Sequence, residues 1–137
     1  SSGMETYHLD TSVVMRLLVQ DPPAQYIRAA EFLEAEMLND AAVFVCDLSL
    51  AEAYFALQSF YGLPKAKALE LLAGFARTPG ITVSDHALTV LSLPNLASAR
   101  PGFADRLIHG TARASGHTLV TFEKSAKSLP GSLVLES

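Results

Sequence analysis

The chain has 137 residues, a usual length for one domain with one hydrophobic core. Half of the residues are hydrophobic and only 18% are charged, so the composition excludes a disordered chain or a coiled coil as the dominant structure. Ten basic residues against fourteen acidic ones give a net charge of −4, the wrong sign for a protein that holds nucleic acid by bulk electrostatics.

Short runs rich in β-branched and aromatic residues alternate along the chain with segments of helical spacing. The runs predict strands over residues 7–9, 42–46, 81–83, 118–122 and 132–135. Helices are expected over 11–19, after Pro23, over 49–61, from Pro64 to Pro79, from Ser84 to Pro94, over 103–115 and over 124–129. This alternation predicts an α/β fold in which a parallel sheet carries helices on both faces.

We expect residues 4–137 to form a single domain of a soluble, cytoplasmic protein. No apolar run approaches the ~18 residues that a membrane-spanning helix needs, and no segment resembles an export leader. The three residues that precede Met4 are interpreted as an expression remnant. Cys46 is the single cysteine, so no disulfide can form within the chain, and the surrounding apolar run predicts a buried, unreactive thiol.

Four acidic residues stand at the ends of predicted strands or in the first turns of neighbouring helices. Asp10 and Glu123 each follow a strand directly, whereas Glu52 and Asp105 lie in first helical turns. Because ligands of parallel sheets bind outside the carboxyl ends of the strands, we expect these four carboxylates to lie at one end of the sheet. Converging carboxylates need a cation, and hard oxygen ligands suit Mg²⁺ or Mn²⁺.

Each acid also has a purely structural interpretation. Asp10 can cap the following helix, and Ser49-x-x-Glu52 has the form of a capping box. Asp105 can interact favourably with a helix dipole, and Glu123 alone is an ordinary surface acid. Against this, Glu52 is the only charged residue from Leu48 to Pro64. The joint placement of the four acids favours a functional site over four separate structural roles.

Basic residues lie in the segments that flank these acids. On the helix over 103–115, Asp105, Arg106, His109 and Arg113 fall within an arc of about 100°, which makes one polar stripe. The candidates for contact with an anionic substrate are Arg16, Arg106, Arg113 and Lys124. Each of these bases can equally be a solvated surface residue.

Five short motifs occur in order along the chain: residues 9–14 (LDTSVV), 50–52 (LAE), 103–108 (FADRLI), 119–124 (LVTFEK) and 129–131 (LPG). In these motifs, and in their order and spacing, the sequence resembles a PIN domain of the VapC type. The resemblance covers residues 4–136. The family's fold is three-layered, with a parallel sheet of about five strands between helices.

The resemblance implies a metal-dependent ribonuclease, commonly the toxin of a pair with a small antitoxin protein, and a homodimer. It identifies Asp10, Glu52 and Asp105 with the family's first three catalytic and metal-binding acids. Glu123 takes a place where the family usually has aspartate. Ser12 and Thr121 match the hydroxyl positions beside the acids. The implied chemistry is hydrolysis of RNA phosphodiester bonds with one or two Mg²⁺ or Mn²⁺ ions.

Two departures from the family pattern leave another function open. Glu123 is one methylene longer than aspartate, and Gly102 stands where many relatives carry a further aspartate. A PIN-fold module that acts through protein contacts, with a weakened or inactive metal site, is therefore the alternative. A nucleotide-binding α/β protein is excluded because neither a Gly-x-Gly-x-x-Gly nor a Walker motif occurs. A phosphate-accepting aspartate at position 10 lacks the second aspartate such sites need.

Overall fold

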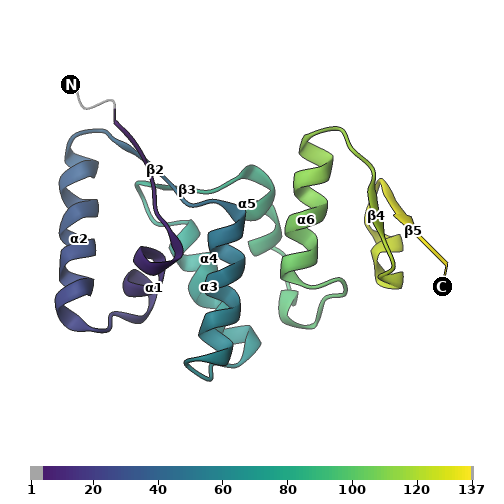
Figure 1. Cartoon of the computed structure of the whole chain (residues 1–137), viewed down its shortest axis with the longest axis horizontal. Coiled ribbons are helices and arrows are strands. Elements are labelled where there is room, and N and C mark those ends of the chain that lie inside the picture. Colours follow the sequence, from purple (N-terminus) through teal and green to yellow (C-terminus); the bar gives the residue numbers. More distant parts are fainter. Residues whose placement is uncertain (1–4, 137) are drawn as a thin grey trace. The chain divides into compact units, whose positions relative to one another are not determined.

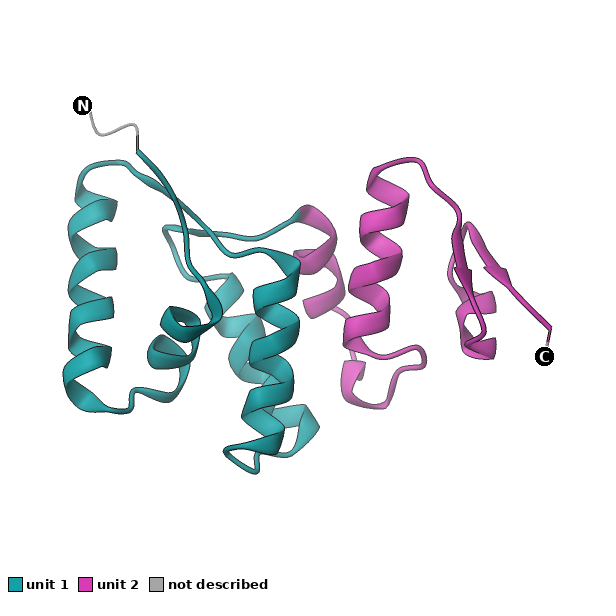
Figure 2. Cartoon of the chain, in the orientation of Figure 1, with its two compact units in different colours: residues 1–84 teal, residues 85–137 magenta. Residues whose placement is uncertain are grey.

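The computed structural model describes residues 5–136, so the three residues interpreted as an expression remnant lie outside the described part. The described residues form two compact units, of which the first ends at Ser84 and the second begins at Asp85 (Figure 2). Within residues 5–136, none of the helices combines the length and the apolar character that crossing a membrane requires.

The first unit is a three-stranded parallel sheet with its helical connections (Figure 1). The strands lie in the order β1-β2-β3, with Tyr7 opposite Val43 and Val43 opposite Ile81. Two helices lie between each strand and the next in the sequence. The elements are β1 (Thr6–His8), α1 (Thr11–Val19), α2 (Pro23–Leu38), β2 (Ala42–Phe44), α3 (Asp47–Ser59), α4 (Lys65–Ala76) and β3 (Ile81–Thr82).

The core of this unit lies where α1, α3 and α4 pack together beside the sheet. Its most buried large side chains come from all of these elements: Val14, Val43, Val45, Leu50, Leu57 and Leu72. Proline sets the start of two helices, because its fixed φ suits the first turn and it has no N–H to leave unpaired. Pro23 is the first residue of α2, and Pro64 is the N-cap of α4.

The second unit packs two helices together and adds a two-stranded parallel sheet. Leu119 of β4 lies opposite Ser132 of β5, and Phe103 and Leu107 of α6 are buried. Gly110 permits the close packing of α5 on α6, since a Cβ there would lie 2.6 Å from the ring of His86. The elements are α5 (Asp85–Leu91), η1 (Leu96–Ser98), α6 (Phe103–Ala114), β4 (Leu119–Thr121), η2 (Lys124–Ser128) and β5 (Ser132–Val134).

The α/β class and the parallel direction of the strands are confirmed. Residues 5–136 contain five strands, the predicted number, but they form a three-stranded and a two-stranded sheet instead of one sheet of five. The physical reason is that a strand pattern specifies which face of a strand is buried, whereas it does not specify the neighbour to which that strand hydrogen-bonds. The sequence pattern therefore could not predict which strands pair with one another.

Candidate functional site

Asp10 is the N-cap of α1, two residues beyond the end of β1. One carboxylate oxygen, Oδ1, accepts hydrogen bonds from the Ser12 hydroxyl at 2.6 Å and from the N–H groups of Ser12 and Val13 at 3.0 and 3.3 Å. The Ser12 hydroxyl and then the Val13 N–H lower the pKa of Asp10. All three bonds go to Oδ1. Within the described residues, the other oxygen, Oδ2, accepts no hydrogen bond, so its lone pairs are available to a ligand.

Glu52 lies on α3 and is bonded to the beginning of α1. The hydroxyl of Thr11, the residue after Asp10, donates a short hydrogen bond to Oε1 of Glu52. The structure therefore brings the segments of Asp10 and Glu52 together. The capping-box interpretation of Ser49 and Glu52 is wrong, because α3 begins at Asp47 with Cys46 as its N-cap. Ser49 is the third residue of the helix and is buried.

The other two acids belong to the second unit. Asp105 is exposed in the first turn of α6, whose N-cap Gly102 has no side chain to offer. Glu123 is the N-cap of η2, and its Oε1 accepts hydrogen bonds from the N–H and the hydroxyl of Ser125 at 3.2 and 3.0 Å. The Ser125 N–H, the Ser125 hydroxyl and the charge of Arg100 hold the pKa of Glu123 below its ordinary value.

The hydroxyl positions beside the acids are used locally. Ser12 donates to Asp10, whereas Thr121 Oγ1 accepts a hydrogen bond from the backbone N–H of Glu123 at 3.0 Å. Ser12 thus holds a carboxylate, and Thr121 fixes the turn from which Glu123 projects.

The donor chemistry of the acids suits a hard divalent cation, since all four candidates offer carboxylate oxygens. Across residues 5–136, however, no group of three or more His, Cys, Asp or Glu side chains lies close enough together to hold a metal ion. In the first unit, the segments of Asp10 and Glu52 lie together. Asp105 and Glu123 belong to the second unit. A shared metal site therefore stays a prediction from the sequence.

The four candidate bases differ in how firmly they are held. Arg16 donates a short hydrogen bond from Nε to the side-chain oxygen of Gln25. Arg106 donates from Nε to the carbonyl of Pro101 at 2.6 Å. Arg113 lies against the backbone of Gly131, and Lys124, at the start of η2, is exposed. Their role in substrate contact stays a prediction.

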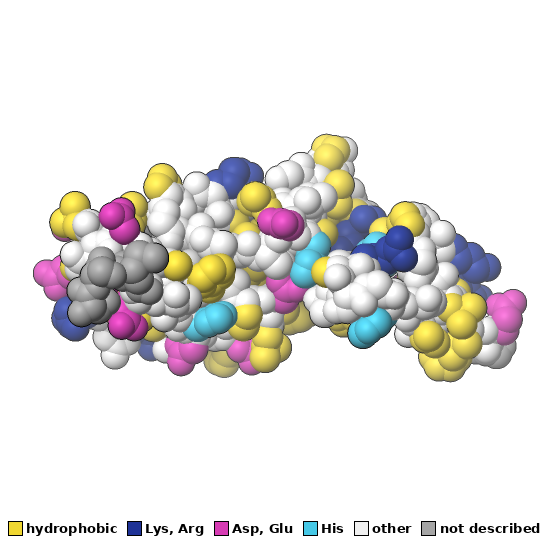
Figure 3. All heavy atoms as spheres, turned by 90° about the horizontal axis from the view of Figure 1, so that it is seen from above, with side chains coloured by type: hydrophobic (Ala, Val, Ile, Leu, Met, Phe, Trp, Pro, Cys, Tyr) yellow, Lys and Arg dark blue, Asp and Glu magenta, His cyan; other side chains and the backbone are white. Residues whose placement is uncertain are grey.

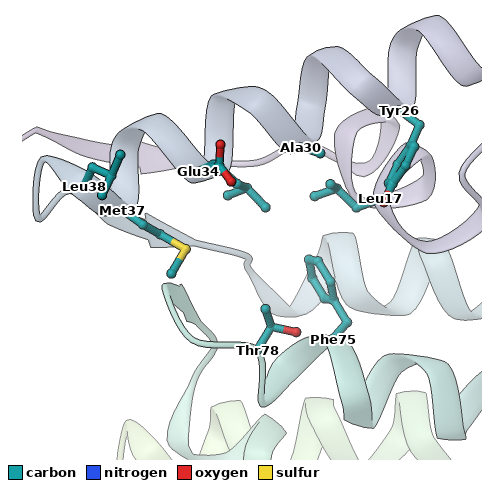
Figure 4. A pocket seen from close by; sticks show the side chains of 9 residues that line it. Leu17, Tyr26, Ala30, Glu34, Met37, Leu38, Phe75 and Thr78 are labelled. Carbon is teal, nitrogen blue, oxygen red and sulfur yellow. The ribbon is translucent and has the colours of Figure 1, made fainter.

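An apolar groove in the first unit was not recognised from the sequence (Figure 4). It has a volume of about 560 Å³ and lies among α1, α2 and the end of α4. The stripe of Tyr26, Ala30, Leu33 and Met37, spaced as in an amphipathic helix, lines it, and α2 has no buried residue in the described chain. Helical spacing identifies the apolar face of a helix, but it does not say whether that face is covered.

Cys46 is exposed, so the expectation that its thiol is buried is wrong. The run of apolar residues before it continues only as far as Val45, which is buried, and Cys46 then becomes the N-cap of α3. The Ser49 hydroxyl, 3.5 Å from the sulfur, and the N–H groups of Ser49 and Leu48 lower the pKa of the thiol. A helix start stabilises a thiolate, because its N–H groups have no partner within the helix.

Comparison with known proteins identifies one family. A family model described as "PIN domain" matches residues 7–131. The crystal structure of VapBC2 from Rickettsia felis, bound to a DNA fragment from their promoter, is similar at 20% sequence identity and a TM-score of 0.38. The alignment covers 96% of this chain and 97% of that one. No curated protein matches the sequence.

The lowered pKa of Cys46 predicts a measurable reactivity. The thiolate is the nucleophile, so the rate of alkylation by iodoacetamide should reach its half-maximal value below the pH of about 8.5 at which an ordinary thiol ionises. In Ser49→Ala the lost hydroxyl should raise this midpoint. Ser59→Ala is the matched control, because the Ser59 hydroxyl donates to the carbonyl of Phe55 on the same helix. Identical pH profiles for wild type and Ser49→Ala would contradict the assignment.

Proposed function

This chain belongs to the PIN domain family, and on that premise we propose that it is a metal-dependent endoribonuclease of the VapC type that hydrolyses RNA phosphodiester bonds. The observation that carries the proposal is the bond between Thr11 and Glu52, which joins the segment of Asp10 to a second acid. The segments of both acids follow adjacent parallel strands, and ligands of such sheets bind outside the carboxyl ends of the strands.

Asp10, Glu52, Asp105 and Glu123 would hold one or two Mg²⁺ or Mn²⁺ ions. The ion would supply a water of lowered pKa as nucleophile and would offset charge on the phosphate and the leaving oxygen. The assignment of Asp105 and Glu123 rests on their motifs in the sequence. That of Asp10 and Glu52 rests on the motifs together with their neighbouring positions in the first unit.

The protein groups prepare these acids for such an ion. Ser12 fixes one oxygen of Asp10 and keeps the carboxylate ionised, while the other oxygen stays available in the described structure. Thr11 orients Glu52 across the gap between α1 and α3. Ser125 plays the same part for Glu123. Arg16, Arg106, Arg113 and Lys124 are proposed to neutralise phosphate charge along the RNA.

The VapC-type motifs also support a biological context. We propose that the chain is the toxin of a toxin–antitoxin pair, that a small antitoxin protein binds it, and that it forms a homodimer. We propose that it acts on RNA in the cytoplasm. These partners follow from the motif resemblance alone, whereas the acids have additional support from hydrogen bonding in the first unit.

Asp10→Asn should abolish metal-dependent RNA cleavage without unfolding the chain. Asparagine caps helices as well as aspartate does, so the bonds to Ser12 and Val13 survive while the charge is lost. Asp105→Asn should act alike. Each should lower the cleavage rate by about a hundredfold or more, since residues that only support a metal ligand are already worth ~10–100-fold. The assay measures cleavage of mixed RNA in Mn²⁺ and Mg²⁺.

Asp40→Asn is the matched control for this experiment. Asp40 is exposed and has a positive φ of 57°, a conformation that asparagine adopts readily, so the same loss of charge occurs at a harmless place. Its cleavage rate should equal that of the wild type. Full activity in Asp10→Asn or Asp105→Asn would remove that residue from the mechanism.

Substitutions of Glu123 distinguish an active enzyme from an inactive interaction module. Glu123→Gln keeps the Oε1 acceptor for Ser125 but removes the charge, so cleavage should fall strongly. Glu123→Asp keeps the charge and should change the rate only modestly. Mn²⁺ should support activity better than Mg²⁺, because Mg²⁺ demands near-ideal octahedral geometry and the longer side chain has one more torsion to fix. If all three proteins are equally inactive in both metals, the interaction module is the better account.

A further inference from the structure

The charges of the chain are distributed unequally between its two units. The sequence from Asp85 onward has five bases against four acids, a net charge of +1, whereas the sequence up to Ser84 has five bases against ten acids, a net charge of −5. Three of the four histidines also lie in the second unit. In Figure 3, Lys, Arg and His side chains gather over the part of the view that holds the C-terminal residues. The net charge of −4 is therefore the sum of an acidic first unit and a slightly basic second unit.

A pocket of about 520 Å³ lies within this second unit, between α5 and α6. Its size is within the range of small-ligand sites. One part of the wall is basic and one part is apolar. The basic part consists of His86, Arg106, His109 and Arg113, and the apolar part includes Val90, Leu93 and Leu129.

The two arginines of the pocket both lie against backbone groups. Arg106 donates from Nε to the carbonyl of Pro101 at 2.6 Å and from Nη2 to the carbonyl of Arg100 at 3.5 Å. Arg113 packs on the turn at Gly131, where φ is +75° and a Cβ would lie 2.2 Å from Nη1. Both guanidinium groups are thus positioned without being neutralised.

No carboxylate of the described chain pairs with either arginine. The ion pairs of Arg28 with Glu31 and of Lys67 with Glu70 both lie in the first unit. Asp85 is the one acid that lines the pocket, and it forms no ion pair there. Two uncompensated guanidinium groups in one pocket provide a positive potential that an anionic ligand would satisfy.

His109 contacts the turn on which Arg113 packs. Its Nε2 lies 2.7 Å from the carbonyl of Pro130, and because a carbonyl can only accept, Nε2 carries the proton and donates. This bond fixes the turn of Pro130 and Gly131, the same turn on which Arg113 packs. The pocket wall is therefore held by a connected set of contacts.

We propose that this pocket binds a nucleoside phosphate. Arg106 and Arg113 bind phosphate oxygens, for which the planar guanidinium is well suited, and the apolar wall packs against the ribose or the base. The ligand is either one nucleotide of an RNA strand or a free mononucleotide. The inference that RNA supplies it rests on the proposed ribonuclease function, to which the pocket would add a substrate subsite.

The test measures binding of a fluorescein-labelled single-stranded RNA decamer to the full chain by fluorescence anisotropy. EDTA is present, so that metal-dependent cleavage does not interfere. Arg113→Gln should raise the Kd roughly tenfold or more, the usual effect of losing a charge-assisted hydrogen bond. The slope of log Kd against log salt should also fall by about 0.7, the value for one lost phosphate contact on a single strand. Lys127→Gln, which removes a charge in the same unit outside the pocket, should leave the Kd within about twofold.

A second pair of variants does not depend on the arginine. Thr89 is exposed on α5 and lines the pocket, so Thr89→Glu places a negative charge in it, whereas Thr89→Gln adds the same volume without charge. The Kd should rise strongly for the glutamate variant and little for the glutamine variant. Circular dichroism of all four variants verifies that they are folded.

Competition with AMP and GMP identifies the source of the nucleotide. Displacement of labelled RNA by excess mononucleotide supports one shared subsite. Binding of a mononucleotide that requires Arg113, without binding of RNA, assigns the pocket to the free nucleotide. The proposal is overturned if the chain binds neither RNA nor a mononucleotide, or if Arg113→Gln and Thr89→Glu both keep the wild-type affinity. An equal loss in Lys127→Gln and Arg113→Gln overturns it too. If the wild-type chain binds RNA in this way but cleaves none in Mn²⁺ or Mg²⁺, only the ribonuclease function is contradicted.

Discussion

The parallel pairing of β1 with β2 is the constraint on which the candidate site depends. Because Tyr7 lies opposite Val43 and the strands run in the same direction, α1 and α3 both begin at the same edge of the sheet. The hydroxyl of Thr11 can then reach Glu52, 41 residues further along the chain. An antiparallel arrangement would place the two helix starts at opposite ends of the strands, and the two acids would be separated.

Local signals of the sequence were sufficient for much of the fold. Proline at the start of α2 and the acid directly before α1 act through the backbone of one turn, so the pattern determines them. The capping box at Ser49 failed because β2 ends at Phe44 and the N-cap of α3 is Cys46, three residues earlier than the motif requires. The exposure of Cys46 has the same origin. Which strands pair and which apolar faces stay open depend on contacts between distant residues, and no local pattern contains them.

The candidate site shows the same division between local and distant information. The sequence predicts Asp10 and Glu52 as site residues from their positions, and the structure adds that one oxygen of Asp10 is fixed by Ser12 while Glu52 is bound by Thr11. The basic pocket was only partly visible, as a polar stripe on α6 that includes Arg106 and Arg113. Its other wall comes from α5, whose approach depends on Gly110, and helical spacing within α6 could not indicate that partner.

The central claim is that the candidate acids bind Mg²⁺ or Mn²⁺, and the thermal stability of the folded chain in Mn²⁺ tests it most directly. A cation that binds only the native state raises the melting temperature. At constant ionic strength, millimolar Mn²⁺ should raise the melting temperature of the wild type, and Asp10→Asn and Asp105→Asn should each lose most of that rise although the two residues lie in different units. A melting temperature of the wild type that does not change with Mn²⁺, or a full rise in either variant, would contradict the claim.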